Sequence, residues 1–136
     1  MDENPNVQLF RAQMDAFGQM DVDRLLLSFA EAAVLQDMSA PDAPWSGKSE
    51  IREFLVDYFS HLSDVRVTIK SVATGEDLVV AELEVDARYA PDASDVAGIH
   101  DVVMRYCVVE VFQSGKIVSE RFYWDRAEFE SQLAAS

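Results

Sequence analysis

The spacing of apolar residues changes from helical to strand-like near residue 62, and this change limits the fold more than any other feature of the chain. Before that point apolar residues recur three and four positions apart, which predicts amphipathic helices; after it they alternate, which predicts strands. The clearest alternation spans residues 78–89, where the positions between the apolar ones hold Glu82, Glu84, Asp86 and Arg88. Helices placed ahead of an antiparallel sheet are typical of the α+β class.

Three helices are expected in the first part of the chain. Asn4 and Pro5 are typical of a helix start, and Gly18 ends that helix. Asp21 caps a second helix, which carries Phe29 on its buried face. The remaining elements expected before residue 65 are a short strand at 33–37, a loop at 38–47 and a helix at 49–62.

Four strands in a meander are expected next, at residues 65–73, 78–89, 99–112 and 116–124. Ser114 and Gly115 form the tight turn between the last two. The strand at 99–112 is apolar on both faces near its middle, which predicts that both faces are covered. Asp125 and Glu128 form a capping box that starts a short C-terminal helix.

The bulk properties describe a single folded domain, residues 1–136, and exclude two classes of partner. A hydrophobic content of 49% excludes a disordered chain. A net charge of −14 repels phosphate backbones and anionic lipids, so neither nucleic acid nor a membrane is an expected partner. The one cysteine, Cys107, allows no intrachain disulfide, and no secretory leader or membrane span is visible, so we expect a cytoplasmic protein.

Two stretches resemble known proteins. FAEAAVLQDMSAPDAPWSGKSEIREFL (29–55) resembles a block of ketosteroid isomerases and SnoaL-like polyketide cyclases. VFQSGKIVSERFYWDRAEFESQL (111–133) resembles the last strand and terminal helix of limonene-epoxide-hydrolase-like and SnoaL-like proteins. The chain is therefore similar to the nuclear-transport-factor-2-like superfamily. The resemblance implies a cone-shaped, curved antiparallel sheet wrapped by three N-terminal helices around one deep pocket, commonly in a dimer.

Asp37 is the first candidate for chemistry. The resemblance puts it at the position of the isomerase general base. Independently, an acid that ends an apolar strand lies near a core edge, where shielding from water makes a carboxylate a better proton acceptor. The alternative is a solvated acid that begins a turn, where Asp is common.

Asp125 and Arg105 are the other catalytic candidates. The resemblance matches Asp125 to the acid that closes the last strand of epoxide-hydrolase-like members, whereas its capping box explains the residue without chemistry. Arg105 lies mid-strand in an apolar run and needs a carboxylate partner if it is buried. Asp37 and Asp125 are the natural partners, which predicts an Asp–Arg–Asp arrangement.

The hydrogen-bond donors of the related enzymes are not retained. The first-helix tyrosine of the isomerases aligns with Gln13, and their strand acid aligns near Met104 or Arg105. The tyrosine and asparagine of the epoxide hydrolases align with Leu35 and Asp37. Neither catalytic set is complete, and other polar groups are expected to line the pocket: Gln13, Trp45, Tyr58, His100 and Tyr123. Two isolated histidines and no phosphate-binding motif predict neither a metal nor a cofactor.

The last strand also predicts an interaction surface. With Tyr123 and Asp125 toward the pocket, alternation places Val118, Phe122 and Trp124 outward, which favours a homodimer through the convex face of the sheet. The function expected is a cofactor-independent acid–base enzyme, an isomerase, cyclase or epoxide hydrolase, acting on a small apolar molecule. The alternatives are a non-catalytic module that binds a small ligand in the same cone, and a subunit that docks a larger enzyme.

Overall fold

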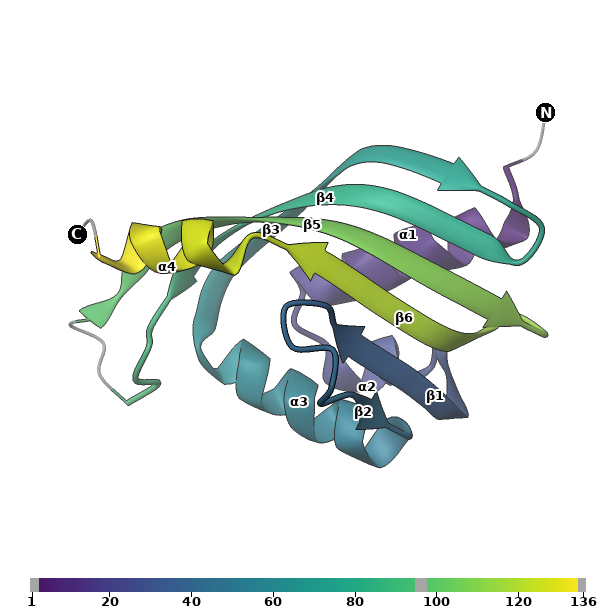
Figure 1. Cartoon of the computed structure of the whole chain (residues 1–136), viewed down its shortest axis with the longest axis horizontal. Helices are drawn as coiled ribbons and strands as arrows, with labels where there is room; N and C mark the ends of the chain where they lie inside the picture. The colour runs from purple at the N-terminus through teal and green to yellow at the C-terminus, as the bar shows by residue number, and fades with distance from the viewer. Residues whose placement is uncertain (1–2, 95–97, 135–136) are drawn as a thin grey trace.

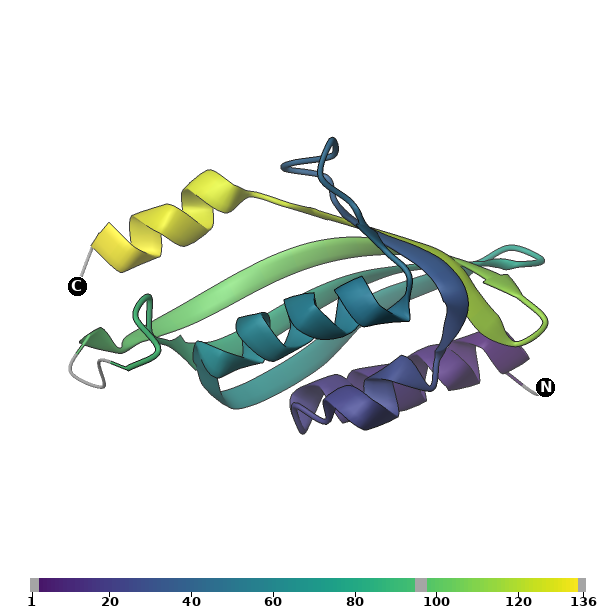
Figure 2. The same cartoon turned by 90° about the horizontal axis from the view of Figure 1, so that it is seen from below.

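The computed structural model describes residues 3–94 and 98–134, which form one curved six-stranded sheet with three helices on its concave side and a fourth at its end (Figures 1 and 2). The strand order is β2-β1-β6-β5-β4-β3. The helices are α1 (Pro5–Gly18), α2 (Val22–Leu26), α3 (Lys48–Ser60) and α4 (Arg126–Ala134). The strands are β1 (Phe29–Asp37), β2 (Trp45–Ser46), β3 (Leu62–Thr74), β4 (Leu78–Tyr89), β5 (His100–Gln113) and β6 (Lys116–Trp124). None of the helices within the described ranges is long and apolar enough to cross a membrane.

The core lies between the concave face of the sheet and the helices α1 and α3, as Figure 2 shows. Phe10 of α1, Ile51 of α3 and Val79 of β4 are fully buried there. The alternation expected for residues 78–89 is confirmed, because the odd-numbered apolar residues from Val79 to Ala87 are all buried. The α+β class and the curved sheet with its N-terminal helices are therefore as the sequence predicts.

The start of the sheet differs from the expectation. β1 begins at Phe29 rather than at residue 33, so Phe29 opens a strand and does not close a helix. Trp45 and Ser46, expected in a loop, form β2 against Leu35 and Val34. β1 then pairs in parallel with β6, so the sheet is not purely antiparallel. Local periodicity cannot show these pairings, because their partners lie far away in the sequence.

The β5–β6 hairpin contains an irregularity that decides which side chains face inward. Its turn is as expected, with positive φ at Ser114 (51°) and Gly115 (75°). Phe112 pairs with Ile117, but Val111 pairs with Ser119, so β6 holds one extra residue at this point. After the extra residue, the even-numbered residues of β6 face inward, whereas strict alternation from the buried Ile117 would place the odd-numbered ones there.

Because of this exchange, the predicted orientation of β6 is wrong. Phe122, expected on the outer face, lines the concave pocket, and Tyr123, expected in the pocket, is 41% exposed. Strand β5 also differs from the prediction that both of its faces are covered. Its odd-numbered residues remain partly exposed on the convex face, as at Val103, Cys107 and Val109.

Helix α4 follows β6 and continues along β5 where β6 has ended (Figure 1). The Gln132 side chain accepts a hydrogen bond from the Val103 backbone nitrogen at 2.7 Å and donates one to the Val103 carbonyl at 2.8 Å. A side-chain amide thus takes the place of a neighbouring strand. Phe129 packs on Trp124 and on Tyr89, which holds α4 against the end of the sheet.

Candidate functional site

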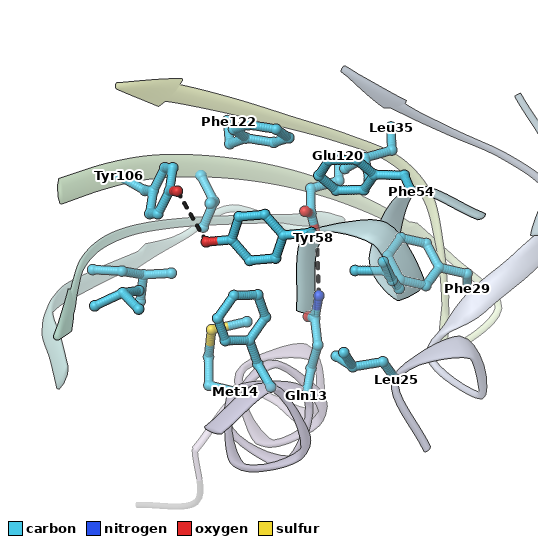
Figure 3. A pocket seen from close by; sticks show the side chains of 15 residues that line it. Gln13, Met14, Leu25, Phe29, Leu35, Phe54, Tyr58, Tyr106, Glu120 and Phe122 are labelled. Carbon is cyan, nitrogen blue, oxygen red and sulfur yellow. Dashed lines mark hydrogen bonds between the residues drawn. The ribbon is translucent and has the colours of Figure 1, made fainter. Parts of the chain in front are cut away.

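A pocket opens on the concave side of the sheet and holds about 640 Å³ of space, its open mouth included. Its walls come from α1, α2, α3 and from four strands (Figure 3). Most of the lining is aliphatic or aromatic, and its polar groups are Gln13, Tyr58, Tyr106 and Glu120. The apolar lining comprises Met14, Phe17, Leu25, Phe29, Leu35, Phe54, Leu55, Leu83, Val85, Val108 and Phe122.

The first polar group of the pocket is a carboxyl–amide pair. Gln13 of α1 donates a hydrogen bond from Nε2 to Glu120 Oε1 on β6, at 3.0 Å (Figure 3). Gln13 lies on the inward face of α1 beside Met14 and Phe10, and it is buried. Glu120 faces inward because of the extra residue in β6. The amide therefore holds one carboxylate oxygen, and the Glu120 carboxyl lies at the pocket surface.

Glu110 lies behind this pair, across the β5–β6 ladder from Glu120. Its exposed fraction is 0%, the same as that of the aliphatic core residues beside it. Burial raises the pKa of Glu110 well above its ordinary value, and the nearby charge of Glu120 raises it further. The Gln13 amide acts in the opposite direction on this pKa. Burial therefore favours the protonated, uncharged form of the Glu110 carboxyl.

The second polar group is a pair of tyrosines. The Tyr58 and Tyr106 hydroxyl oxygens are 3.1 Å apart (Figure 3). Both hydroxyls also lie near the Met104 sulfur, at 3.6 and 3.3 Å. Burial raises the pKa of Tyr58 to about 12 and that of Tyr106 well above its ordinary value. Both phenols therefore remain protonated at neutral pH. A thioether is a weak acceptor, so one of these donors is available to a better one.

The lining carries negative charge without a basic partner. Among the described residues that line the pocket, Glu120 is the only acidic one, and none is lysine, arginine or histidine. Nowhere in residues 3–94 and 98–134 do three or more His, Cys, Asp or Glu side chains gather as a metal site would require. The site therefore combines the carboxyl group of Glu120 with the hydroxyl donors of Tyr58 and Tyr106 in apolar surroundings.

Asp37 lies outside this lining and has partners of its own. Its Oδ1 accepts hydrogen bonds from the Ser39 backbone nitrogen and hydroxyl, both at 2.8 Å, and from Trp124 Nε1 at 3.0 Å. The side chain closes the turn after β1 and fixes Trp124, whose ring packs on Tyr106. This is the turn-forming alternative considered for Asp37 from the sequence.

Arg105 and Asp125 are not brought together with Asp37. Arg105 points to the convex face, where it forms ion pairs with Glu84 at 3.5 Å and with Glu128. Asp125 is exposed and accepts a hydrogen bond from the Glu128 backbone nitrogen at 3.0 Å, as its capping box predicts. The Asp–Arg–Asp arrangement does not form among the described residues, because Arg105 occupies an outward position of β5.

Of the five polar residues expected in the pocket, two line it and three lie elsewhere. Gln13 and Tyr58 line it. Trp45 lies one layer behind and packs on the lining residue Phe54, with the two ring centroids 4.0 Å apart. His100 lies at the start of β5, paired with Tyr89, and Tyr123 lies on the convex face.

Three functional groups were not identified from the sequence: Glu110, Glu120 and Tyr106. Glu110 carried a usable signal, since it is a single acid in the run Cys107–Phe112 and shares a face with Val108 and Phe112. Glu120 carried none, because strict alternation groups it with Phe122 and Trp124 on the face that was expected to point outward. Only the register of the hairpin places Glu120 opposite Glu110.

The family model of the SnoaL-like domain matches residues 10–120, which is most of the chain. No curated protein sequence is significantly similar to the chain. Many solved structures share the fold. A SnoaL-like polyketide-cyclase-type protein from Shewanella denitrificans superposes with a TM-score of 0.86 at 16% identity, over 98% of this chain and 100% of that one.

Two further structures extend the range of functions on this fold. An epoxide hydrolase of the limonene-epoxide-hydrolase type from M. tuberculosis gives a TM-score of 0.77 at 16% identity, over 96% of this chain and 90% of that one. A protein with a ketosteroid-isomerase-like fold from Catenulispora acidiphila, in complex with trimethylamine, gives 0.77 at 17% identity, over 93% and 92%. At these identities the likeness shows the fold alone.

Proposed function

We propose that this chain, which belongs to the SnoaL-like domain family, is a cofactor-independent acid–base enzyme acting on a small apolar carbonyl compound. One observation carries the proposal: the Glu120 carboxyl and the Tyr58–Tyr106 hydroxyl pair face the same apolar pocket. A proton acceptor and a neutral hydrogen-bond donor in a water-poor site are the two groups that enolisation requires.

The reaction follows from these two groups. Glu120 removes a proton from the carbon next to the carbonyl, and the electron pair of that C–H bond moves to the carbonyl oxygen. A tyrosine hydroxyl donates a hydrogen bond to the resulting enolate oxygen, in place of its weak bond to the Met104 sulfur. Glu120 then returns the proton to the same or a conjugated carbon. No electrons are gained or lost, so the step is an exchange or an isomerisation.

The lining also limits the substrate. Glu120 lies on one side of the pocket, and no basic side chain among the described lining residues offsets its carboxylate. The Glu120 carboxylate repels an anionic ligand, so we expect a neutral or positively charged molecule. The aromatic rings of Phe54, Tyr58 and Phe122 favour a ring or a branched apolar body.

The test is proton exchange into heavy water. A panel of apolar ketones is incubated with the protein in D2O, and loss of the C–H signal beside the carbonyl is followed by NMR. We expect Tyr58→Phe to slow this exchange about 100-fold, because one donor to the enolate is removed while Tyr106 remains. Leu27→Ala, at a residue 66% exposed, is the matched control. Unchanged exchange in Tyr58→Phe would show that the Tyr58 hydroxyl takes no part in the mechanism.

A non-catalytic function has one observation in its favour. The pocket combines aromatic rings with a single carboxylate, an arrangement that suits a small organic cation through cation–π contact and charge. The related Catenulispora acidiphila structure contains trimethylamine. If the protein binds alkylammonium ions tightly and exchanges no proton on any ketone of the panel, the binding function replaces the enzymatic one.

We also propose that the protein is a homodimer through the convex face. The support differs from that expected from the sequence: Val109 and Val80 pair across the ladder on this face, and Tyr123 is exposed beside Cys107. Light scattering is expected to give the mass of a dimer, and Tyr123→Glu to give that of a monomer. Leu27→Glu, at an exposed apolar residue in another part of the molecule, should remain dimeric. A monomeric wild type would disprove the proposal.

A further inference from the structure

Glu110 is a completely buried acid that the proposed reaction does not use. Neither of its carboxylate oxygens has a hydrogen-bond donor among the described residues. An ionised carboxylate without a donor is strongly disfavoured in such a place, so the side chain must carry a proton. A protonated carboxyl then needs an acceptor for its own O–H, because an unpaired buried donor is also costly.

The groups that face Glu110 leave few choices for that acceptor. On the β4 side its ladder partner is Val79, an apolar residue. From α1 comes Gln13, whose amide nitrogen is bonded to Glu120 and whose carbonyl oxygen has no partner among the described residues. On the β6 side the ladder partner is Glu120. Glu120 is thus the titratable group that faces Glu110, and its carboxylate is the strongest acceptor available.

We propose that Glu110 and Glu120 form a carboxyl pair that holds one proton between them in the free protein, with Glu110 as the positioning residue for the Glu120 carboxylate. In this pair the Glu110 hydroxyl donates to one side of the Glu120 carboxyl, and the Gln13 amide donates to Glu120 as well. The high pKa of Glu110, raised by burial and by the charge of Glu120, agrees with this arrangement.

The pair has a consequence for the reaction. Two donors, Glu110 and Gln13, hold the Glu120 carboxylate in one orientation toward the pocket. When Glu120 takes a proton from the substrate the pair becomes neutral, and when Glu120 returns that proton the single negative charge is restored. This role rests on the acid–base function proposed above, whereas the shared proton is a property of the free protein and needs no substrate.

The experiment is a carboxyl titration by NMR on protein labelled with ¹³C at the glutamate side-chain carboxyl, followed from acid to alkaline pH. The Glu110 signal is assigned by its loss in Glu110→Gln. We expect its midpoint in the wild type to lie far above that of the other glutamates. In Glu120→Gln the midpoint should fall by more than about one pH unit, since the interacting charge is removed. Glu120→Asp, which keeps the charge, should restore part of the shift.

Glu84→Gln is the matched control. Glu84 lies on the opposite face of the same sheet and is paired with Arg105, so its loss should leave the Glu110 midpoint unchanged. An infrared spectrum at neutral pH provides a second measurement: a protonated-carboxyl C=O band should be present in the wild type and absent in Glu110→Gln.

Either of two results would overturn the pair. One is a Glu110 midpoint that does not respond to Glu120→Gln, and the other is a Glu110 that titrates with the surface glutamates. Proton exchange on substrate is a separate measurement. If the titration shows the shared proton but no ketone exchanges, the acid–base function is wrong and the carboxyl pair stands. If exchange occurs but Glu110 titrates independently of Glu120, Glu120 remains the base and Glu110 is only a core residue.

Discussion

Glu120→Gln should lower the rate of substrate proton exchange by about 100- to 10,000-fold, the contribution that a positioned general base makes. Glutamine has nearly the same shape as glutamate but its amide cannot take a proton from carbon. The Gln13 contact can persist, because the new amide oxygen accepts the same hydrogen bond. The loss should therefore appear in the rate and leave the unfolding transition almost unchanged.

Asp37→Asn is the variant whose exchange rate should be compared with that of Glu120→Gln. Asp37 was the base expected from the sequence, whereas in the structure its oxygen accepts bonds from Ser39 and Trp124. We expect Asp37→Asn to retain most of the exchange activity. If instead Asp37→Asn loses activity and Glu120→Gln keeps it, the assignment of the base to Glu120 is wrong and Asp37 is the general base.

Glu110→Gln should make the protein more stable relative to the wild type as the pH rises. The folded-state pKa of Glu110 lies well above the unfolded value near 4.5. The stabilisation that its proton provides is fully present below that unfolded value and is lost as the pH rises through the folded pKa. Over this window the difference in unfolding free energy should change by about 1.4 kcal/mol per pH unit in favour of Glu110→Gln, which does not titrate.

Urea unfolding at a series of pH values measures this difference, because subtraction of the two curves cancels the carboxylates that both proteins share. Glu84→Gln, on the exposed face, should run parallel to the wild type once its ion pair with Arg105 is allowed for. Parallel curves for Glu110→Gln and the wild type would show that Glu110 is ionised in the folded protein, contrary to its complete burial.

Much of the fold follows from local patterns. The alternation from Val79 to Ala87 predicts a strand with one buried face, and this strand is in the structure. The Ser114–Gly115 turn and the Asp125–Glu128 cap are also present as expected. These features depend on residues close in the sequence, so spacing and residue type are sufficient to predict them.

The chemistry of the pocket depended on contacts that spacing does not contain. The sequence shows that β6 has two alternating faces, but one extra residue after Ile117 decides that Glu120 and Phe122 turn inward and that Tyr123 turns outward. By itself the sequence determined an α+β domain with a strongly apolar core and an acidic surface. Only the tertiary structure decided which acids face the pocket, because strand register and burial arise from pairing between distant segments.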